Sequence, residues 1–425
     1  MGVTVLVVGS GGREHALAWR LAGEGVDVAV APGNGGAPWA VPIQATDVDG
    51  LARFATEQAV SLTIVGPEAP LAAGLVNTFA ERGLRAFGPT RAAARLEWSK
   101  GWAKEFLRRR GIPTGKAELV DSEAGARRAV GRCGLPVVIK ADGLAGGKGV
   151  WVAHTRGEVE LALDALFRRR TLGAAGEQVL IEEYLDGVEV TVMVFTDGER
   201  LAIMPPARDY KRAADGDRGP NTGGMGGYSR PGYATPELLE RIEHEIVRPT
   251  LEGMAAEGHA YRGVLYAQLM VTAGGPKVVE FNSRFGDPEA QLVLPLLRSS
   301  LVEVCAAVAE GRLEPDQVRW APEWTCGVVL AAPGYPEAPR LGARIEGLDA
   351  LPSDVLAFQA GTRLDEDGRL VTAGGRVLTL VASGRSLAEA REQVYAAVPR
   401  VRFEACQYRN DIGLEVPAPS VGVLA

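Results

Sequence analysis

The chain has 425 residues, of which 46% are hydrophobic and 23% charged, and its formal net charge is −7. This length predicts roughly three domains with ample hydrophobic cores, in a composition ordinary for a soluble globular protein. The acidic balance, without a block of basic residues, argues against nucleic-acid binding. No apolar run approaches the length of a membrane span, so we expect no membrane association.

The cysteine pattern bears on the compartment. Four cysteines are scattered along the chain without a CxxC pair, which is typical of unpaired thiols in a reducing environment. The apolar run 3–8 is too short for the core of a signal peptide and leads into glycines instead of a cleavage site. We therefore expect a cytoplasmic protein.

The first strand, 3–8, is apolar apart from Thr4, as in a buried parallel sheet. A glycine-rich loop and a helical pattern follow it, and this order can hold a phosphate on backbone N–H groups. We expect Gly11 and Gly12 to contact a phosphorylated substrate, with Arg13 as a counter-charge and Glu14 beside it. Because Glu14 replaces the third glycine of the dinucleotide motif, NAD is not expected. The alternative is a glycine turn required only for packing.

Two more strands of this region end in loops, at 28–34 and 62–68. In an open parallel sheet, ligands bind beyond the carboxyl ends of the strands. Asn34 and Glu68 are therefore expected to reach the same ligand, and Glu68 could accept hydrogen bonds from sugar hydroxyls. Alternatively, Glu68 caps the helix that follows.

The middle of the chain carries lysines around a glycine-rich hairpin. Strand 136–140 ends in Lys140, and the loop that leads into strand 150–153 contains Lys148. Burying an ammonium without an anion is costly, so both lysines are expected to contact a triphosphate. The preceding helix, 99–110, carries Lys100 and Lys104; for Lys104 we favour a solvent-exposed position on an amphipathic helix.

A later strand places Glu280 and Asn282 two residues apart, so their side chains share one face. One anionic and one neutral oxygen ligand suit Mg²⁺, which completes its shell with water and phosphate. Arg284 offers a planar fork to a phosphate or carboxylate, and Asp287 and Glu289 add carboxylates. The alternative is a solvated strand end with a surface ion pair.

The segment 208–228 is too long and glycine-rich for a simple connector. We interpret it as an active-site lid that closes through its glycines, with Lys211 and Asn221 reaching phosphate or glycine and Asp209 near the substrate. The alternative is a disordered surface loop. Helix 236–257 is expected to be scaffold. A small α+β module with strands 326–331 and 376–381 and helix 386–397 ends the chain, and we expect it to close the substrate cleft without contributing chemistry.

The order and spacing of Lys100, Lys140, the glycine hairpin, Glu189 and the Glu280/Asn282 pair resemble the ATP-grasp superfamily. Within it, the chain resembles the phosphoribosylamine–glycine ligase (glycinamide ribonucleotide synthetase) family. The stretches that carry this resemblance are GSGGREHAL (9–17), APGN (31–34), IVGPEAPL (64–71), VIKADGLA (138–145), GPNTGGMG (219–226) and EFNSRFGDPE (280–289).

The resemblance implies an α/β and α+β multidomain fold. A Rossmann-like N-terminal domain (1–102) would bind phosphoribosylamine. An ATP-grasp core of two α+β subdomains (103–325) would follow, with an ATP lid subdomain at about 122–188. A small C-terminal α+β domain (326–425) would complete the chain.

The resemblance also implies roles for single residues. Lys100, Lys140 and Lys148 would hold ATP phosphates, Glu182 and the Leu185 backbone would contact adenine, and Glu189 would contact the ribose. Glu280 and Asn282 would bind Mg²⁺ or Mn²⁺. Many ATP-grasp enzymes carry an acidic ligand on the preceding strand, where this chain has Gln268, so a second metal would depend more on phosphate and water. The residues expected to act in catalysis are Lys140, Lys148, Lys211 and Arg284.

The implied reaction joins glycine to 5-phosphoribosylamine with ATP, through a glycyl phosphate, to give glycinamide ribonucleotide, ADP and phosphate in purine biosynthesis. The partners would be these small molecules alone, and a monomer is the simplest expectation. Two alternatives stay open. One is another ATP-grasp enzyme, such as a carboxylase that uses bicarbonate, and the other is a non-catalytic nucleotide-binding protein.

Overall fold

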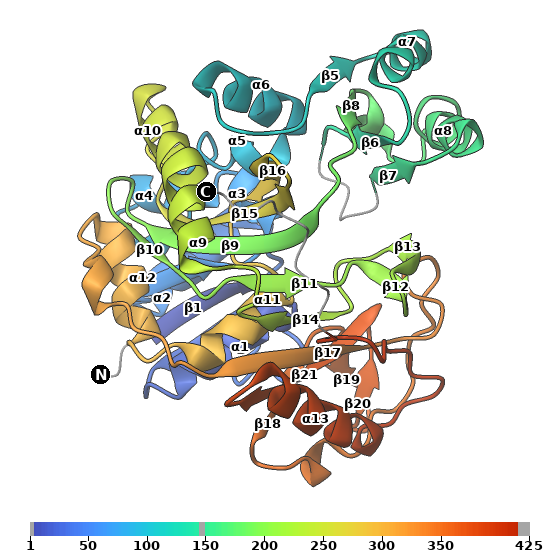
Figure 1. The fold of residues 1–425 in the computed structure, drawn as a ribbon. Coiled ribbons are helices and arrows are strands. Elements are labelled where there is room, and N and C mark those ends of the chain that lie inside the picture. Colours follow the sequence, from blue (N-terminus) through green and yellow to red (C-terminus); the bar gives the residue numbers. More distant parts are fainter. Residues whose placement is uncertain (1–3, 144–148, 415–425) are drawn as a thin grey trace.

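The computed structural model describes residues 4–143 and 149–414. Its first unit, which lies around the labelled strand β1 in Figure 1, is a four-stranded parallel sheet in the order β2-β1-β3-β4. Alternate residues of β1 pack on opposite faces, Val5 and Val7 on one core and Leu6 and Val8 on another. The expected buried parallel sheet is therefore confirmed. Its elements are β1 (Thr4–Gly9), α1 (Gly12–Ala22), β2 (Asp27–Pro32), α2 (Val48–Glu57), β3 (Leu62–Val65), α3 (Glu68–Ala72), α4 (Leu75–Glu81) and β4 (Ala86–Phe87).

A large antiparallel sheet forms the centre of the molecule, in the order β16-β15-β9-β11-β14-β17-β21-β18, with β10 paired to β9. Because β14 pairs with β17, the C-terminal strands continue the sheet formed by the middle part of the chain. The strands are β9 (Val188–Thr196), β10 (Leu201–Ile203), β11 (Ala207–Asp209), β14 (Gly226–Ser229), β15 (Gly263–Thr272), β16 (Gly275–Asn282), β17 (Trp324–Ala331), β18 (Val355–Gln359) and β21 (Arg376–Gly384).

Helices cover this sheet. The expected helix 99–110 is α6 (Lys100–Arg110), which Ser99 caps at its start and which ends at Gly111 in the left-handed conformation (φ 66°). The expected helix 236–257 forms as α9 (Pro236–Ile242), a π-helical turn (Glu243–Val247) and α10 (Arg248–Ala256). Together with α5 (Arg95–Trp98), these helices, strands β9–β11 and β14–β16 and the segment 283–310 are called the body below. The other helices are α11 (Glu289–Val293), α12 (Leu301–Glu310) and α13 (Leu387–Ala397), the last of which packs on β17 and β21.

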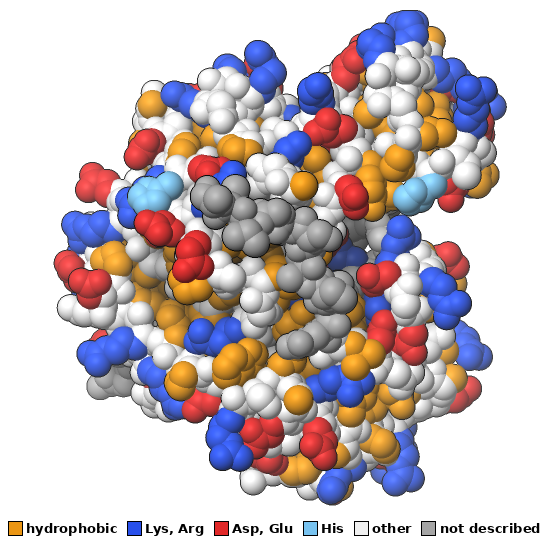
Figure 2. Space-filling view, in the orientation of Figure 1, with side chains coloured by type: hydrophobic (Ala, Val, Ile, Leu, Met, Phe, Trp, Pro, Cys, Tyr) orange, Lys and Arg blue, Asp and Glu red, His pale blue; other side chains and the backbone are white. Residues whose placement is uncertain are grey.

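A separate lobe, called the lid subdomain below, holds an antiparallel sheet in the order β5-β8-β6-β7. It has its own hydrophobic core, whose members all lie between residues 126 and 181. In the surface view this lobe stands off from the rest of the molecule above an indentation (Figure 2). The expected hairpin of strands is confirmed, while Lys148 lies outside the described residues. The elements are β5 (Ala117–Val120), α7 (Glu123–Cys133), β6 (Val137–Ala141), β7 (Val150–Ala153), α8 (Arg156–Leu163) and β8 (Val179–Glu183).

The segment 208–228 is not the free glycine-rich lid that the sequence predicted. It contains β11 and β14 of the large sheet, joined through a small hairpin of β12 (Arg212–Ala214) and β13 (Arg218–Asn221). A Cβ at Gly226 would lie 2.4 Å from the carbonyl oxygen of Gly327, and one at Gly227 would lie 2.3 Å from that of Arg208. These glycines therefore permit close strand packing, so the prediction of a lid that closes through them was wrong.

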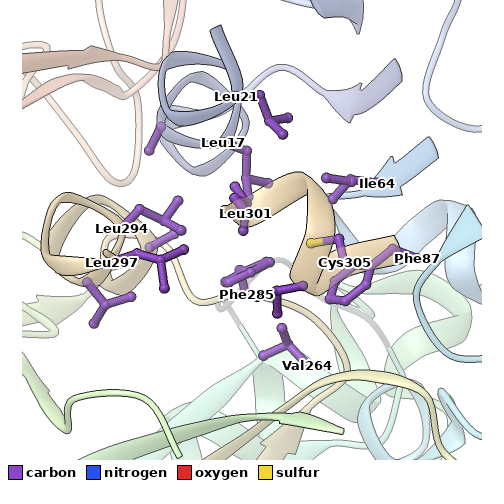
Figure 3. Packing of buried hydrophobic residues seen from close by; sticks show 14 of the residues in the cluster. Leu17, Leu21, Ile64, Phe87, Val264, Phe285, Leu294, Leu297, Leu301 and Cys305 are labelled. Carbon is purple, nitrogen blue, oxygen red and sulfur yellow. The ribbon is translucent and has the colours of Figure 1, made fainter. Parts of the chain in front are cut away.

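The N-terminal sheet is joined to the body by a shared apolar core (Figure 3). Leu17 of α1 and Phe87 of β4 belong to the same cluster as Phe285, Leu301 and Cys305. All four cysteines are free thiols, as expected. Within residues 4–143 and 149–414, no helix combines the length and the apolar character that crossing a membrane would require.

Candidate active site

The loop after β1 is shaped from inside by Glu14. This carboxylate is 1% exposed and accepts hydrogen bonds from the Gly11 backbone N–H (2.6 Å) and from Nε of Arg13 (2.5 Å). A Cβ on Gly66 would lie 2.0 Å from Oε1 of Glu14. The glycines here thus make room for a buried carboxylate. Glu14, which the sequence placed near the substrate, is turned into the loop and not toward solvent.

The same loop is fastened to two distant parts of the chain. Arg13 donates to the Phe285 carbonyl oxygen (3.1 Å). The Asn34 side-chain amide donates to the carbonyl oxygens of Ser10 (3.0 Å) and Gln359 (2.8 Å), the latter in β18. The edge of the N-terminal sheet is therefore built jointly with the body and the C-terminal module.

Arg284 lies at the centre of this edge. Its guanidinium is 2.9 Å from Oε1 of Glu97 and 3.5 Å from Oε2 of Glu68, and it donates to Oδ1 of Asn282 (3.1 Å). Burial raises the pKa of the Glu97 carboxyl even though Arg284 opposes it. Burial also acts on Glu68, but Arg284 and Arg13 outweigh it and lower the pKa of Glu68. Glu97 was not predicted from the sequence, because no pattern marks it within the four-residue helix Arg95–Trp98.

The predicted metal ligands lie at the end of β16. Glu280 is 3.7 Å from Nζ of Lys100. Burial disfavours its charge, but the nearby cations Lys100, Lys140, Lys211 and Arg284 prevail and lower the pKa of Glu280 to about 2. Among the described residues, no three His, Cys, Asp or Glu side chains come together as a metal site. One ionised carboxylate and one amide oxygen on a strand face fit a Mg²⁺ or Mn²⁺ ion that arrives with phosphate and water ligands.

Lys140 and Lys104 share a buried carboxylate. Nζ of Lys140 lies 2.7 Å from Oε2 of Glu182, and Lys104 donates to Oε1 of Glu182 and to the Thr114 hydroxyl (2.6 Å). Lys104 is only 9% exposed, so its expected solvent-exposed position was wrong. The reason is tertiary: Glu182 of β8 and Thr114 meet this face of α6, which the helix pattern alone could not show.

The residues expected at the nucleoside lie just beyond, where β8 leads into β9. Leu185 is buried, and the Glu189 carboxylate accepts a hydrogen bond from the Gln268 amide (3.2 Å). The backbone carbonyl of Glu189 accepts a hydrogen bond from the Tyr233 hydroxyl (2.6 Å). Gln268, which stands where many ATP-grasp enzymes carry an acid, is thus paired with the predicted ribose ligand.

A second buried cluster surrounds Lys211, whose Nζ lies 2.9 Å from Oδ2 of Asp209. Nearby, Glu289 accepts hydrogen bonds from the hydroxyls of Tyr266 (2.7 Å) and Thr191 (3.3 Å). Burial raises the pKa of both carboxyls, Asp209 and Glu289. The sequence indicated Asp209 and Lys211, but Tyr266 and Thr191 read there as ordinary strand residues.

The C-terminal module contributes a charged side chain to this cluster. Arg376 lies 3.3 Å from Oδ1 of Asp287 and donates to the carbonyl oxygens of Asp287 (2.8 Å) and Gly223 (2.7 Å). Burial opposes ionisation of Asp287, but Arg376 and Arg13 outweigh it and lower the pKa of Asp287. Arg376 begins a strand, so its sequence context gave no sign of this role.

Family models match the chain in three consecutive parts. They are the N domain (residues 3–97), the ATP-grasp (A) domain (98–290) and the C domain (325–415) of phosphoribosylglycinamide synthetase. A phosphoribosylamine–glycine ligase from Xylella fastidiosa is 48% identical over 417 residues, which cover 96% of this chain and 97% of that protein. The chain belongs to the phosphoribosylglycinamide synthetase family.

Solved structures agree with this membership. The crystal structure of phosphoribosylamine–glycine ligase from Thermotoga maritima matches with a TM-score of 0.83 and 36% identity, covering 96% of this chain and all of that one. The biotin carboxylase domain of the Hydrogenobacter thermophilus 2-oxoglutarate carboxylase matches with a TM-score of 0.74 at 17% identity, over 96% of this chain and 92% of that one. The second likeness shows the ATP-grasp fold alone.

In this phosphoribosylglycinamide synthetase, most of the site residues predicted from the sequence lie in one region, where the edge of the N-terminal sheet, the body and the lid subdomain meet. Asn221 lies on the small β12–β13 hairpin, opposite Arg212. Lys148 belongs to the part of the chain that is not described.

Proposed function

We propose that this protein joins glycine to 5-phosphoribosylamine with ATP, giving glycinamide ribonucleotide, ADP and phosphate in de novo purine biosynthesis. One observation carries the proposal. In a chain that is 48% identical over 96% of its length to a phosphoribosylamine–glycine ligase, Lys140 and Glu280 line one cavity where the lid subdomain meets the body. The Hydrogenobacter thermophilus biotin carboxylase domain shares the fold at only 17% identity, so a bicarbonate-using activity is not favoured.

The nucleotide would bind between the lid subdomain and the body. Lys100, Lys140 and Lys148 would contact its phosphates. Glu182 is buried, with its Oε2 2.7 Å from Nζ of Lys140, and this carboxylate would accept a hydrogen bond from the adenine amino group. The Leu185 backbone would complete the adenine contacts, and Glu189 would accept hydrogen bonds from the ribose hydroxyls.

Glu280 and Asn282 would hold Mg²⁺ or Mn²⁺, which neutralises phosphate oxygens when bound. Since the pKa of Glu280 is about 2, this carboxylate stays ionised at any physiological pH. Asn282 already accepts a hydrogen bond from Arg284. Arg284 would therefore position a metal ligand while it offsets charge on the transferring phosphoryl group.

The substrates would meet between these two sites. The phosphoribosylamine site would comprise Gly11, Gly12, Arg13, Glu14, Asn34 and Glu68, with Glu14 acting through the loop that it shapes. Asp209, Asn221 and Asp287 would bind glycine and the reacting amine, and Lys211 would contact the transferred phosphate.

The glycine carboxylate would attack the γ-phosphorus, and ADP would leave. The amine of phosphoribosylamine would then attack the acyl carbon and release phosphate, so no protein nucleophile is required. Lys140, Lys148, Lys211 and Arg284 would offset the developing negative charge. Closure of the lid subdomain would exclude water from the acyl phosphate.

Phosphate release tests this proposal directly. Purified protein with Mg²⁺, ATP and freshly prepared phosphoribosylamine should release phosphate only when glycine is added, and Glu280→Ala should abolish the release. Release that depends on bicarbonate and ignores glycine would overturn the named substrate. Nucleotide binding without release under any of these conditions would favour a non-catalytic role. A monomeric state, a cytoplasmic location and the absence of nucleic-acid partners remain predictions of this proposal.

A further inference from the structure

The lid subdomain and the body meet through charged side chains that are almost fully buried. Helix α6 belongs to the body, because Phe106 and Leu107 pack in the same core as Leu251 and Val278. Strands β6 and β8 belong to the lid subdomain, which has a core of its own. Lys104 of α6 therefore reaches across the junction when it donates to Glu182 of β8.

Lys140 also crosses this junction. Its ammonium lies 2.7 Å from Oε2 of Glu182 within the lid subdomain and donates to the Val279 carbonyl oxygen of β16 in the body (3.3 Å). Lys104, Lys140 and Glu182 are 9%, 3% and 2% exposed. One carboxylate thus serves two buried ammonium groups from two different parts of the molecule.

A cavity of about 20 Å³ opens at this junction, and Lys100, Lys104, Lys140 and Glu280 are among the residues that line it. Under the proposed function, Lys140 must turn its ammonium toward nucleotide phosphate. That movement would weaken its contact with Glu182. A buried carboxylate left without a cation is strongly unfavourable, so a second cation must stay with Glu182 while the nucleotide is bound.

We propose that Lys104 is this second cation: a positioning residue that keeps Glu182 ionised and the lid subdomain docked on α6 while Lys140 serves the phosphates. Lys104 is suited to this role because its other hydrogen bond goes to Thr114, whose hydroxyl donates to the Val278 carbonyl oxygen of the body (2.7 Å). The inference rests on the proposed nucleotide site and deepens it, since it separates a lysine that contacts ligand from one that holds the site.

The chain offers a matched control. Lys277 of β16 and Glu183 of β8 also form an ion pair between body and lid subdomain, at 3.4 Å, but their side chains are 35% and 29% exposed. Exposed pairs of this kind contribute little. Lys277→Met therefore removes the same charge from the same junction without disturbing a buried carboxylate.

The primary experiment is MgADP binding by calorimetry, together with the steady-state KM for ATP. Lys104→Met should weaken MgADP binding and raise the KM for ATP by about tenfold or more, because it breaks a buried pair. The kcat at saturating ATP and the KM for glycine should change by less than about threefold. Lys277→Met should match the wild type in all four quantities. A folded Lys104→Met protein, verified by circular dichroism, that binds MgADP like the wild type would overturn the inference.

A double-mutant cycle separates this role from a general effect on folding. If Lys104 acts through Glu182, Lys104→Met should weaken MgADP binding by less than about twofold in a Glu182→Gln background. If Lys104→Met instead weakens MgADP binding by the same factor with and without Glu182→Gln, the inference is contradicted. Should Lys104→Met fail to fold, Thr114→Val provides a milder test, with a severalfold weaker affinity expected, and an unchanged affinity would then decide against the inference.

The two proposals fail in different ways. Wild-type protein that binds MgADP but releases no phosphate in response to glycine would overturn the ligase proposal and leave the role of Lys104 open to the binding test above. Glycine-dependent release that survives Lys104→Met, with an unchanged KM for ATP, would overturn the role of Lys104 alone.

Discussion

The N-terminal domain and the lid subdomain are attached to the body by different kinds of contact. Leu17 of the N-terminal domain shares an apolar core with Phe285 and Leu301, whereas every member of the lid core lies within the lid subdomain itself. The described contacts from the lid to α6 are largely polar, such as those of Asp142 with the Gly101 N–H (2.5 Å) and the Ser99 hydroxyl (3.3 Å). Segments joined by few apolar contacts open most readily. We therefore expect a fixed substrate loop and a moving nucleotide lid.

A leucine-to-alanine substitution in each of the two cores should test this difference in attachment most clearly. Leu17 and Leu163 are both fully buried, the first in the shared core and the second in the lid core. Leu17→Ala should lower the free energy of unfolding of the N-terminal domain and the body together by about 2–5 kcal/mol. Urea denaturation followed by tryptophan fluorescence would measure this. Unfolding of the N-terminal domain alone, with the body unaffected, would contradict a shared core.

Leu163→Ala should remove a similar free energy, about 2–5 kcal/mol, but only from the lid subdomain. Hydrogen exchange should accelerate at amides of β6, β8 and α8 and stay unchanged in β1 and β15, because separate cores open separately. Accelerated exchange in β1 as well would show that the two cores unfold as one unit.

The sequence predicted the elements better than their surroundings. Strands β1, β3, β6 and β17 were indicated by apolar or β-branched runs, which depend on neighbouring residues along the chain. Segment 208–228 was misread because glycine favours both free loops and strands that pack without side chains. Only the tertiary structure tells a free loop from a tightly packed strand here, because a Cβ on Gly226 would lie 2.4 Å from the carbonyl oxygen of Gly327.

The candidate site was predictable where residues sit at the ends of strands, as Lys140 and Glu280 do. It was not predictable where the partner comes from a distant element. Glu97, Arg376 and Lys104 acquire their roles from residues 186, 89 and 78 positions away, at Ser283, Asp287 and Glu182 respectively. A helix pattern shows which face of α6 is polar but not which strand covers it.

A smaller effect should follow from the polar attachment of the lid. Asp142→Ala removes the carboxylate that accepts hydrogen bonds from the start of α6, an interaction of the helix-capping kind worth about 0.5–2 kcal/mol. The KM for ATP should rise by about tenfold. The midpoint urea concentration for unfolding of the N-terminal domain and body should stay the same as in the wild type. A matched loss of global stability would mean that the contact belongs to the common core and not to a movable junction.

The mildest perturbation of the junction is pH. Burial and the neighbouring Lys140 lower the pKa of Lys104 from its ordinary 10.5 to about 8, although Glu182 opposes them. The other charged groups that face Lys104 are Glu182, Lys140 and Glu280. Glu182 and Glu280 have lowered pKa values, and that of Lys140 is raised. Of these four groups, only Lys104 titrates between pH 7 and 9.

Its deprotonation should act in opposite directions on binding and on stability. Above pH 8 the folded protein without nucleotide loses the buried positive charge of Lys104, whereas in the unfolded chain Lys104 stays protonated up to about pH 10.5. The unfolded state therefore binds more protons between these two pH values, so the contribution of Lys104 to the free energy of unfolding rises with pH there. Glu182 meanwhile loses its second cation, so MgADP binding should weaken by about threefold to tenfold from pH 7 to 9. Calorimetric titrations at pH 7, 8 and 9 would show this weakening in the wild type and its absence in Lys104→Met. An equal weakening in both proteins would assign the effect to a different group, because the variant has no ammonium at this position to lose.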